Sequence, residues 1–386
     1  MNPAPQLHWQ EGGTGHCARW HSEAGVPPPA RVQLADDTLA ADAAYRLVCE
    51  GTALLWRGDF QNARHLLQAL ARRIDRKPRN PPGKAPPEAK VPAVQLFQQH
   101  RQAQGRRARL LAMLLIPLEA DYSIPLRRAP DLRQACTEAW GPADGGASVA
   151  SLRELLGLVG AHEWRKKGVE VAALGPAPGN RIHAHYGVFS PVRGEYLDLL
   201  ARVPLPSTGL AFDIGTGTGV VAALLARRGV QRVIATDIDP RALACARDNL
   251  ERLGVADQVE LLQADLFPPG QAPLVVCNPP WLPARPSSPI EHAIYDEDSR
   301  MLHGFLQGLA AHLAPGGEGW LILSDLAEHL GLRAQGELQS RFGTAGLRVL
   351  ERKTIKPRHP KAADAADPLA HARSREITSL WRLAVT

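Results

Sequence analysis

The tetrapeptide Asn278-Pro279-Pro280-Trp281 combines residue types that together can hold a planar nitrogen group. Asn278 supplies a side-chain carbonyl, and a proline supplies a backbone carbonyl without adding a competing N–H. Two acceptors on the N–H groups of an amide or aromatic amine draw electron density onto that nitrogen and orient it toward an electrophile. Positioning of this kind contributes roughly 7–11 kcal/mol in favourable intramolecular reactions. Because Trp281 adds a flat aromatic face, the motif predicts a cradle for an amino or amide nitrogen.

The same residues have an ordinary structural explanation, since Asn and Pro both favour turns. A second motif weighs against that explanation. The segment Asp213-Ile214-Gly215-Thr216-Gly217-Thr218-Gly219 follows an apolar run, 209–212, and precedes an apolar helical run, 220–226. Glycines between a strand and a helix allow a sharp turn and the close approach of a ligand. The context therefore predicts a nucleoside-cofactor loop.

A dinucleotide-binding loop would need glycine at the sixth place of G-x-G-x-x-G. Counted from Gly215, that place holds Val220. The frame from Gly217 ends at Ala222, which that fingerprint tolerates, but this frame leaves Asp213 and Gly215 unexplained. The pattern D-x-G-x-G-x-G describes the segment better.

Polar residues also end the neighbouring predicted strands. Asp237 ends the strand predicted over 231–236, where a carboxylate can accept both hydroxyls of a ribose. Asp239, followed by Pro240, is the expected cap of a helix over 241–252. Asp265 follows the strand predicted over 258–263, where it could bond the exocyclic amine of an adenine. Because open parallel sheets bind ligands at the carboxyl ends of their strands, these acids and Asn278 are predicted to form one site.

These motifs resemble those of class I S-adenosylmethionine-dependent methyltransferases, over about residues 168–386. More narrowly, the chain is similar to enzymes with an [ND]PP[YFW] motif. These are the amino-methyltransferases of adenine and guanine bases and the release-factor glutamine methyltransferases. Trp281 departs from the commoner Tyr or Phe of that motif. The resemblance implies an N-methyltransferase that uses S-adenosyl-L-methionine.

The resemblance also implies a role for each matching residue. Asp213 to Gly219 would cradle the methionine part of the cofactor, Asp237 would hold the ribose, and Asp265 with the Leu266 backbone would read adenine. Segment 186–191 would close over the cofactor. The implied catalytic residues are Asn278, Pro279, Pro280 and Trp281. The implied cofactor-binding residues are Ser190, Asp213, Gly215, Thr216, Gly217, Gly219, Asp237, Ile238, Asp265, Leu266 and Asn278.

The expected fold class is α/β, a Rossmann-like seven-stranded methyltransferase sheet of order 3-2-1-4-5-7-6, preceded by a mainly α-helical N-terminal domain. The expected division has four parts. Residues 1–36 are a poorly defined segment, and residues 37–150 a helical domain that, by analogy, recognises the substrate. Residues 151–200 are connecting helices and a hairpin, and residues 201–386 the S-adenosylmethionine-binding catalytic domain.

Charge favours an anionic partner. The chain carries a formal net charge of +6. A Pro-rich stretch, 72–109, has eleven Lys or Arg against two acids, and a loop near the C-terminus, 352–375, has seven against two. Such clusters suit nucleic acid, although a solvated basic face has the same composition. RNA or a ribosomal particle is therefore favoured over protein as the macromolecular substrate.

The cysteines and the apolar runs indicate no other class of protein. The 5 cysteines include no CxxC pair, so neither a zinc site nor a disulfide framework is expected. No apolar run approaches about 18 residues and no signal peptide is evident, so a cytoplasmic protein without membrane contact is expected.

Three functions are consistent with these patterns. The first is an N-methyltransferase acting on a nucleobase amine in RNA, such as ribosomal RNA. The second is an N5-glutamine methyltransferase of a protein such as a peptide chain release factor. The third is an inactive cofactor-binding interaction protein, against which the intact Asn278-Pro279-Pro280-Trp281 argues. The sequence does not indicate an oligomeric state.

Overall fold

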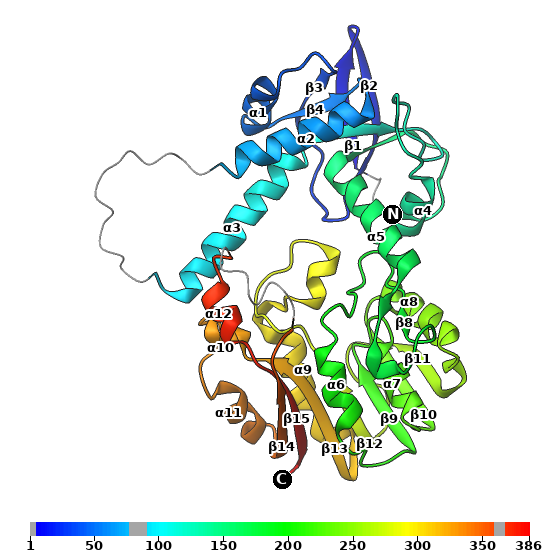
Figure 1. The fold of residues 1–386 in the computed structure, drawn as a ribbon, viewed down its shortest axis with the longest axis vertical. Coiled ribbons are helices and arrows are strands. Elements are labelled where there is room, and N and C mark those ends of the chain that lie inside the picture. The colour runs from blue at the N-terminus through cyan, green and yellow to red at the C-terminus, as the bar shows by residue number, and fades with distance from the viewer. Residues whose placement is uncertain (1–4, 77–90, 359–366) are drawn as a thin grey trace. The chain divides into compact units, whose positions relative to one another are not determined.

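The computed structural model describes residues 5–76, 91–358 and 367–386. These form two compact units, which are described separately. One comprises Met1–Lys90 with Gln98–Glu163, and the other comprises Val91–Phe97 with Trp164–Thr386. Two of the three division points fall inside helices, namely α3 (Ala93–Leu111) and α5 (Leu152–Lys167) (Figure 1).

The N-terminal unit is built on a six-stranded mixed sheet of order β1-β2-β6-β5-β4-β3. Its neighbours β3, β4 and β5 run parallel, while β6 is antiparallel to β5. The strands are β1 (Gln6–Glu11), β2 (Thr14–His21), β3 (Arg31–Ala35), β4 (Thr52–Trp56), β5 (Leu114–Leu118) and β6 (Ser148–Ser151). The helices that lie wholly within this unit are α1 (Ala41–Cys49), α2 (Phe60–Ile74) and α4 (Arg133–Trp140).

Residues 37–150 hold four helices, but they also contribute β4, β5 and most of β6 to the sheet, which the expectation of a mainly helical domain did not include. The short apolar runs that form β4 and β5 were assigned to the neighbouring helices, but both are buried parallel strands. Apolar runs of this length are ambiguous between helix and strand, and the sheet decides the outcome because it buries both faces of such a run.

Residues 1–36 are also more ordered than expected, because they contain three of the six strands. Gly12 and Gly13 join β1 to β2, with φ of 59° and 82°. Two residues with positive φ make the turn that suits a two-residue hairpin. The Gly-Gly pair between two short runs was the signal for this hairpin.

The C-terminal unit contains a seven-stranded sheet of order β11-β10-β9-β12-β13-β15-β14, so the predicted order 3-2-1-4-5-7-6 is confirmed. All neighbours are parallel except β15, which is antiparallel to β13 and to β14. The strands are β9 (Leu210–Ile214), β10 (Arg232–Asp237), β11 (Val259–Gln263), β12 (Ala272–Cys277), β13 (Leu313–Ser324), β14 (Leu347–Ile355) and β15 (Thr378–Val385).

Helices cover both faces of this sheet (Figure 1). Along β12, Leu274 and Val276 join one buried apolar cluster, while Val275 and Cys277 join another. This alternation follows from the two-residue period of a strand, so the two clusters lie on opposite faces. The helices are α6 (Glu195–Arg202), α7 (Val220–Arg227), α8 (Pro240–Arg252), α9 (Arg300–His312), α10 (Leu326–His329), α11 (Glu337–Thr344) and α12 (Ala370–Arg375).

The connection into this unit includes a short hairpin of β7 (Val169–Glu170) and β8 (Arg181–Ile182), as expected. The Pro-rich residues 77–90 and residues 359–366 of the basic loop lie outside the described residues. Among the helices that are described, none combines the length and the apolar character needed to cross a bilayer.

Candidate active site

The polar residues that end the central strands come together at one edge of the sheet. Strands β11, β10, β9 and β12 are neighbours and run parallel, so their carboxyl ends share that edge. In register, Asp213 lies beside Ala235 of β10 and Val276 of β12. Asp237 ends β10 and Asn278 directly follows β12. The predicted alignment of strand ends is confirmed.

The glycine loop between β9 and α7 needs its glycines for definite reasons. Gly215, Gly217 and Gly219 have φ of 73°, 55° and 78°, which disfavours other residues. A Cβ on Gly215 would lie 2.4 Å from Met301 Cε, and one on Gly219 would lie 3.1 Å from Ala246 Cβ. A Cβ on Gly217 would meet no described atom within 4 Å. The middle glycine therefore faces open space that a ligand can fill.

The N–H groups of this loop bond within the protein. Both Gly215 N and Thr216 N donate to the Thr236 carbonyl, at 2.9 and 2.8 Å. Gly217 N donates to Asp237 Oδ2 at 2.9 Å. A dinucleotide loop instead directs such groups at a pyrophosphate. These three N–H groups are therefore satisfied within the protein, which agrees with the choice of D-x-G-x-G-x-G.

Asp213 organises the loop from inside. Its side chain is buried, and Oδ2 accepts hydrogen bonds from Thr216 Oγ1 at 2.6 Å and Ala222 N at 3.1 Å. Burial raises the pKa of Asp213 to about 7, opposed by these two bonds. The carboxyl group thus satisfies the Ala222 N–H in the first turn of α7.

Asp237 connects the second strand to the loop. Its Oδ2 accepts from Gly217 N and its Oδ1 accepts from Asp239 N at 3.0 Å, while burial raises its pKa. The neighbouring Ile238 leaves 59% of its surface exposed at the strand end. Asp239 accepts from Arg241 N at 2.8 Å and caps α8, as the sequence predicted.

Asp265 and Leu266 follow the third strand. Asp265 forms an ion pair with Arg300, and the side chains of both residues are more than half exposed. Leu266 has a φ of 76°, and its carbonyl accepts from Thr236 Oγ1 at 2.5 Å. This bond fixes the backbone that follows β11 against β10.

Asn278 is held through the oxygen of its amide. Oδ1 accepts from Trp281 Nε1 at 3.0 Å. Pro279 is buried, and Trp281 packs partly buried against the apolar clusters of both sheet faces.

Orphaned polar atoms show that the residues fit a bound polar group. Within the described residues, Ser190 Oγ and Glu195 Oε1 are buried and have no hydrogen-bond partner. A buried oxygen without a partner is costly unless a ligand satisfies it. Ser190 belongs to the segment that the resemblance assigned to the cofactor, whereas Glu195 was not among the expected residues. With the open face of Gly217, these atoms suit a nucleoside cofactor that carries amino and hydroxyl groups.

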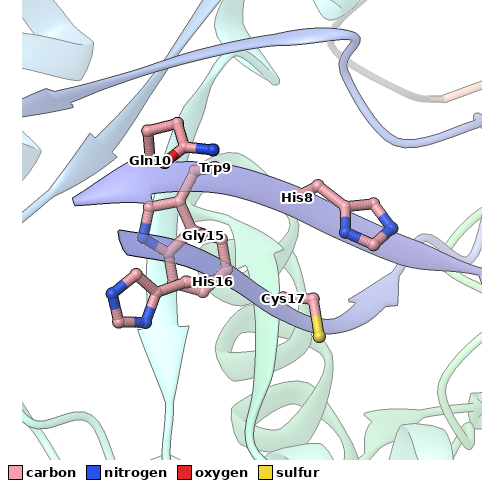
Figure 2. A pocket seen from close by; sticks show the side chains of 6 residues that line it. All are labelled: His8, Trp9, Gln10, Gly15, His16 and Cys17. Atoms are coloured by element: carbon pink, nitrogen blue, oxygen red, sulfur yellow. The ribbon is translucent and has the colours of Figure 1, made fainter. Parts of the chain in front are cut away.

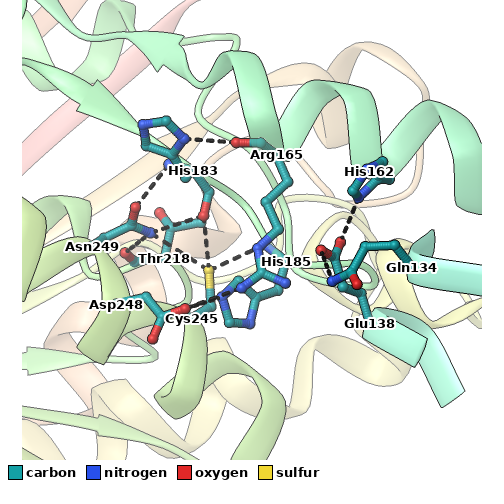
Figure 3. Close-up of polar contacts among 10 residues, drawn as sticks. All are labelled: Gln134, Glu138, His162, Arg165, His183, His185, Thr218, Cys245, Asp248 and Asn249. Atoms are coloured by element: carbon teal, nitrogen blue, oxygen red, sulfur yellow. Dashed lines mark hydrogen bonds and ion pairs between the residues drawn. The ribbon is translucent and has the colours of Figure 1, made fainter. Parts of the chain in front are cut away.

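A second missed residue, Asn249, supports the loop from α8. Its Nδ2 donates to the carbonyls of His183 and Thr218 at 3.2 and 3.1 Å, while its Oδ1 accepts from His183 N at 2.7 Å. Figure 3 shows this network around the fully buried amide, with His185 and Asp248 beside it. Asn249 therefore ties the glycine loop to the segment that follows β8.

A pocket of the N-terminal unit lies on the β1–β2 hairpin (Figure 2). The rings of Trp9 and His16 stack with their centroids 5.5 Å apart, and Arg57 lies over Trp9 at 5.9 Å. This is a surface feature separate from the strand-end site. It offers flat aromatic and cationic groups.

The described residues contain no grouped metal ligands and no disulfide. Over residues 5–76, 91–358 and 367–386, no three His, Cys, Asp or Glu side chains are grouped to hold a metal ion. All five cysteines are free, and burial raises the pKa of the Cys277 thiol beside Asn278. Cys277 is accordingly a small buried strand residue.

Fold and site together define a nucleoside-cofactor protein of the Rossmann-like methyltransferase type. Residues 179–353 match the family described as "Methyltransferase small domain". The chain is 37% identical over 158 residues to a ribosomal protein L11 methyltransferase of Pelotomaculum thermopropionicum, covering 40% of this chain and 43% of the relative. It is 35% identical over 152 residues to a release factor glutamine methyltransferase of Cereibacter sphaeroides, covering 36% and 53%.

A third relative is a tRNA1(Val) (adenine(37)-N6)-methyltransferase of Shewanella loihica, 30% identical over 169 residues, covering 40% of this chain and 69% of the relative. The chain belongs to the small-domain family of class I S-adenosylmethionine-dependent methyltransferases. The cofactor of this family is S-adenosyl-L-methionine. The chain spans about half the length of the first curated relatives it matches.

Asp213 should make stability depend on pH. In the folded protein the pKa of Asp213 is about 7, whereas in the unfolded chain it is about 3.9. The protonated carboxyl group therefore stabilises the folded state fully below about pH 3.9, and this stabilisation is lost as the pH rises through about 7. Asp213→Asn keeps an acceptor for Thr216 and Ala222 but cannot ionise. We expect the melting temperature of this variant to increase relative to that of wild type as the pH rises from 4 to 7. Calorimetry at several pH values measures this difference.

Asp257 is exposed, so Asp257→Asn provides the control. The melting temperature of this variant should change with pH in the same way as that of wild type. A constant difference between Asp213→Asn and wild type across that range would show that Asp213 is ionised in the folded protein throughout.

Proposed function

We propose that this chain transfers a methyl group from S-adenosyl-L-methionine to a planar amino or amide nitrogen of a macromolecule. The observation that carries the proposal is the alignment of the glycine loop, Asp237 and Asn278 at one sheet edge. The third possible function, an inactive binding protein, would not require an Asn278 side chain positioned by Trp281.

The cofactor would lie along the strand ends. The open face of Gly217 would contact the methionine part together with Gly215, Thr216, Gly219 and the orphaned Ser190 Oγ. Asp237 would accept the ribose hydroxyls, since each carboxylate oxygen can accept more than the one bond it has. The exposed Ile238, with Asp265 and the Leu266 backbone, would contact the adenine. Asp213 would act indirectly, because its carboxyl group faces the loop interior.

When bound, the cofactor supplies an electrophilic methyl group on a sulfonium. The chain's own residues position the nucleophile. Asn278 Oδ1 and the Pro279 carbonyl would accept from the N–H groups of the target, and Trp281 would stack on its plane. Held in this way, the target nitrogen would form the new C–N bond while the C–S bond of the sulfonium would break and leave its electrons on sulfur. A proton then leaves the nitrogen to water, so no strong base is needed beforehand.

An amine of a nucleobase in RNA is the favoured target. Support comes from the net charge of +6, from the arginines of α3 and from the stacked Trp9–His16 pair with Arg57. Stacking aromatic side chains and cationic groups are the usual means of binding RNA. In this proposal the N-terminal unit recognises the macromolecule. The alternative target is a protein glutamine, whose amide nitrogen would fit the same acceptors.

The first prediction from this proposal concerns the ribose. Asp237→Ala removes both the ribose acceptor and the partner of Gly217 N, so affinity for S-adenosylmethionine should fall at least tenfold, about 1.4 kcal/mol. Isothermal titration calorimetry measures it. The control is Asp239→Ala, which removes the cap of α8 at a cost of about 1 kcal/mol of stability and should leave cofactor affinity unchanged. Equal cofactor affinities for Asp237→Ala and wild type would show that Asp237 does not bind the ribose.

The second concerns catalysis. Asn278→Ala should lower turnover by roughly 10²–10³, the effect of losing one positioned polar partner, with cofactor affinity nearly unchanged. Single-turnover kinetics with radiolabelled cofactor on a confirmed substrate measures this. More than half of the wild-type rate in the variant would refute the role of Asn278.

The third concerns the macromolecule. Because phosphate contacts release counterions, RNA affinity should fall steeply as salt rises. Neutralising Arg106 and Arg109 on α3 should weaken binding across unrelated RNA sequences, whereas Arg232→Gln at the opposite edge of the catalytic sheet should not. Trp281→Ala should impair methylation more than binding.

The same assay separates the two targets. Labelled methyl transferred to cell lysate should be lost on treatment with ribonuclease and should be found on a nucleobase. Label that survives ribonuclease and lies on a glutamine side chain would overturn the RNA target and leave the assignments of the strand-end residues in place.

A further inference from the structure

The side-chain amide of Asn249 on α8 bonds two segments that lie far apart in sequence (Figure 3). Its Oδ1 accepts from His183 N at 2.7 Å, and its Nδ2 donates to the carbonyls of His183 and Thr218 at 3.2 and 3.1 Å. A backbone N–H can only donate and a carbonyl can only accept, so these contacts assign both ends of the amide. The residue is fully buried, so its amide is held away from solvent.

Each of the two segments carries atoms that face the proposed cofactor site. Thr218 follows Gly217, where an added Cβ would meet no described atom within 4 Å. The segment that begins at His183 leads to Ser190, whose buried Oγ has no hydrogen-bond partner within the described residues. Asn249 therefore joins two parts of the chain that the cofactor would contact.

Neighbouring residues of α8 contact the same two segments. One turn before Asn249, Cys245 Sγ accepts from His185 N at 3.3 Å. Ala246 lies against the glycine loop, because a Cβ on Gly219 would be 3.1 Å from Ala246 Cβ. Residues three and four positions apart are neighbours on a helix surface, so these contacts come from one face of α8. This face forms a common base for the loop and for the segment after β8.

The glycine loop needs such a base because of its composition. Glycine loses more conformational freedom on ordering than any other residue, and the loop has three glycines within positions 215–219. Asp237 holds Gly217 N at 2.9 Å, and Asn249 holds the carbonyl of the next residue. A loop that is ordered before its ligand arrives binds that ligand more tightly, because binding then does not have to order it.

We propose that Asn249 is a positioning residue for the cofactor, whose amide holds the glycine loop and residues 183–190 in the arrangement that binds S-adenosylmethionine. This inference rests on the placement of the cofactor at the strand ends under the proposed function. Asn249 itself need not touch the cofactor, because its amide faces backbone groups of the protein.

The first test is Asn249→Ala, which removes the amide without adding a charge. Its Kd for S-adenosylhomocysteine should rise at least tenfold, measured well below its melting temperature. In the ligand-free variant, hydrogen exchange should become faster at residues 183–190 and 215–219, because both segments lose their common partner.

Asn180→Ala is the matched control. Asn180 is also a buried asparagine, 2% exposed, and its Nδ2 donates to the Gly175 carbonyl at 2.9 Å, away from the glycine loop. This variant should lower the melting temperature but keep the Kd within twofold of wild type and leave the exchange of residues 215–219 unchanged.

A second variant gives a pH readout that a loss of packing does not produce. Asn249→Asp keeps the shape of the side chain, but an ionised carboxylate cannot donate to either carbonyl, whereas the protonated form can donate to one. Burial raises the pKa of such a carboxyl group, so it ionises only as the pH rises. The ratio of the Kd of this variant to that of wild type should therefore increase between about pH 5 and pH 9.

This ratio removes the titration of the groups that both proteins share. The charged and titratable side chains on the elements around position 249 are those of His183, His185, Cys245, Asp248 and Arg165, with Asp213 and Asp237 at the glycine loop. Only the new carboxyl group differs between the two proteins.

Several results would overturn the inference. A Kd of Asn249→Ala within twofold of wild type would show that the amide does not affect binding. Weaker binding with unchanged exchange at residues 215–219 would show that Asn249 does not order the loop. A Kd ratio for Asn249→Asp that stays constant with pH would show that donation from this position is not required.

The proposed function fails by a different result. A wild-type protein that binds S-adenosylhomocysteine but methylates neither RNA nor protein refutes the proposed methyl transfer. The binding and exchange measurements on the Asn249 variants do not use turnover, so they would still decide the role of this residue.

Discussion

The site depends on one constraint, the parallel alignment of β11, β10, β9 and β12. Each helix crossover returns the chain to the same end of the sheet, so every strand in this set ends at one edge. Groups far apart in sequence therefore meet without a dedicated contact between their side chains. The bond from Gly217 N to Asp237 then joins the loop after β9 to the end of β10. Disrupting the alignment would separate the cofactor loop from Asn278.

Some polar groups of the loop and of the segment before β9 bond within the protein, and others have no partner in it. Asp213 and the N–H groups of Gly215 and Thr216 are satisfied within the protein and keep the loop in its shape. Ser190 Oγ and Glu195 Oε1 are buried without partners among the described residues. The satisfied loop N–H groups leave fewer donors for a pyrophosphate than a dinucleotide loop presents.

The catalytic half of the fold was predictable because its signals are local. Each motif directly follows an apolar run, and strand order then comes from the family resemblance. The N-terminal sheet was not predictable to the same extent. Its strands β4 and β5 are short apolar runs whose periodicity does not distinguish strand from helix, and only pairing with neighbours decides.

Asn249 was missed because its partners are distant in sequence. It bonds His183, 66 positions away, and the carbonyl of Thr218 in the glycine loop. It belongs to no motif, so no local signal marks it. Its role comes from packing that brings the segment before β9 against α8.

The central claim is that the strand-end edge holds the cofactor with its reactive group toward Asn278. A crystal structure with S-adenosylhomocysteine tests this most directly. The account predicts the ribose hydroxyls at Asp237, the amino-acid part against Gly217, and the sulfur on the side of Asn278 Oδ1. Cofactor density elsewhere on the protein, or an Asn278 amide turned with its nitrogen toward the sulfur, would contradict it.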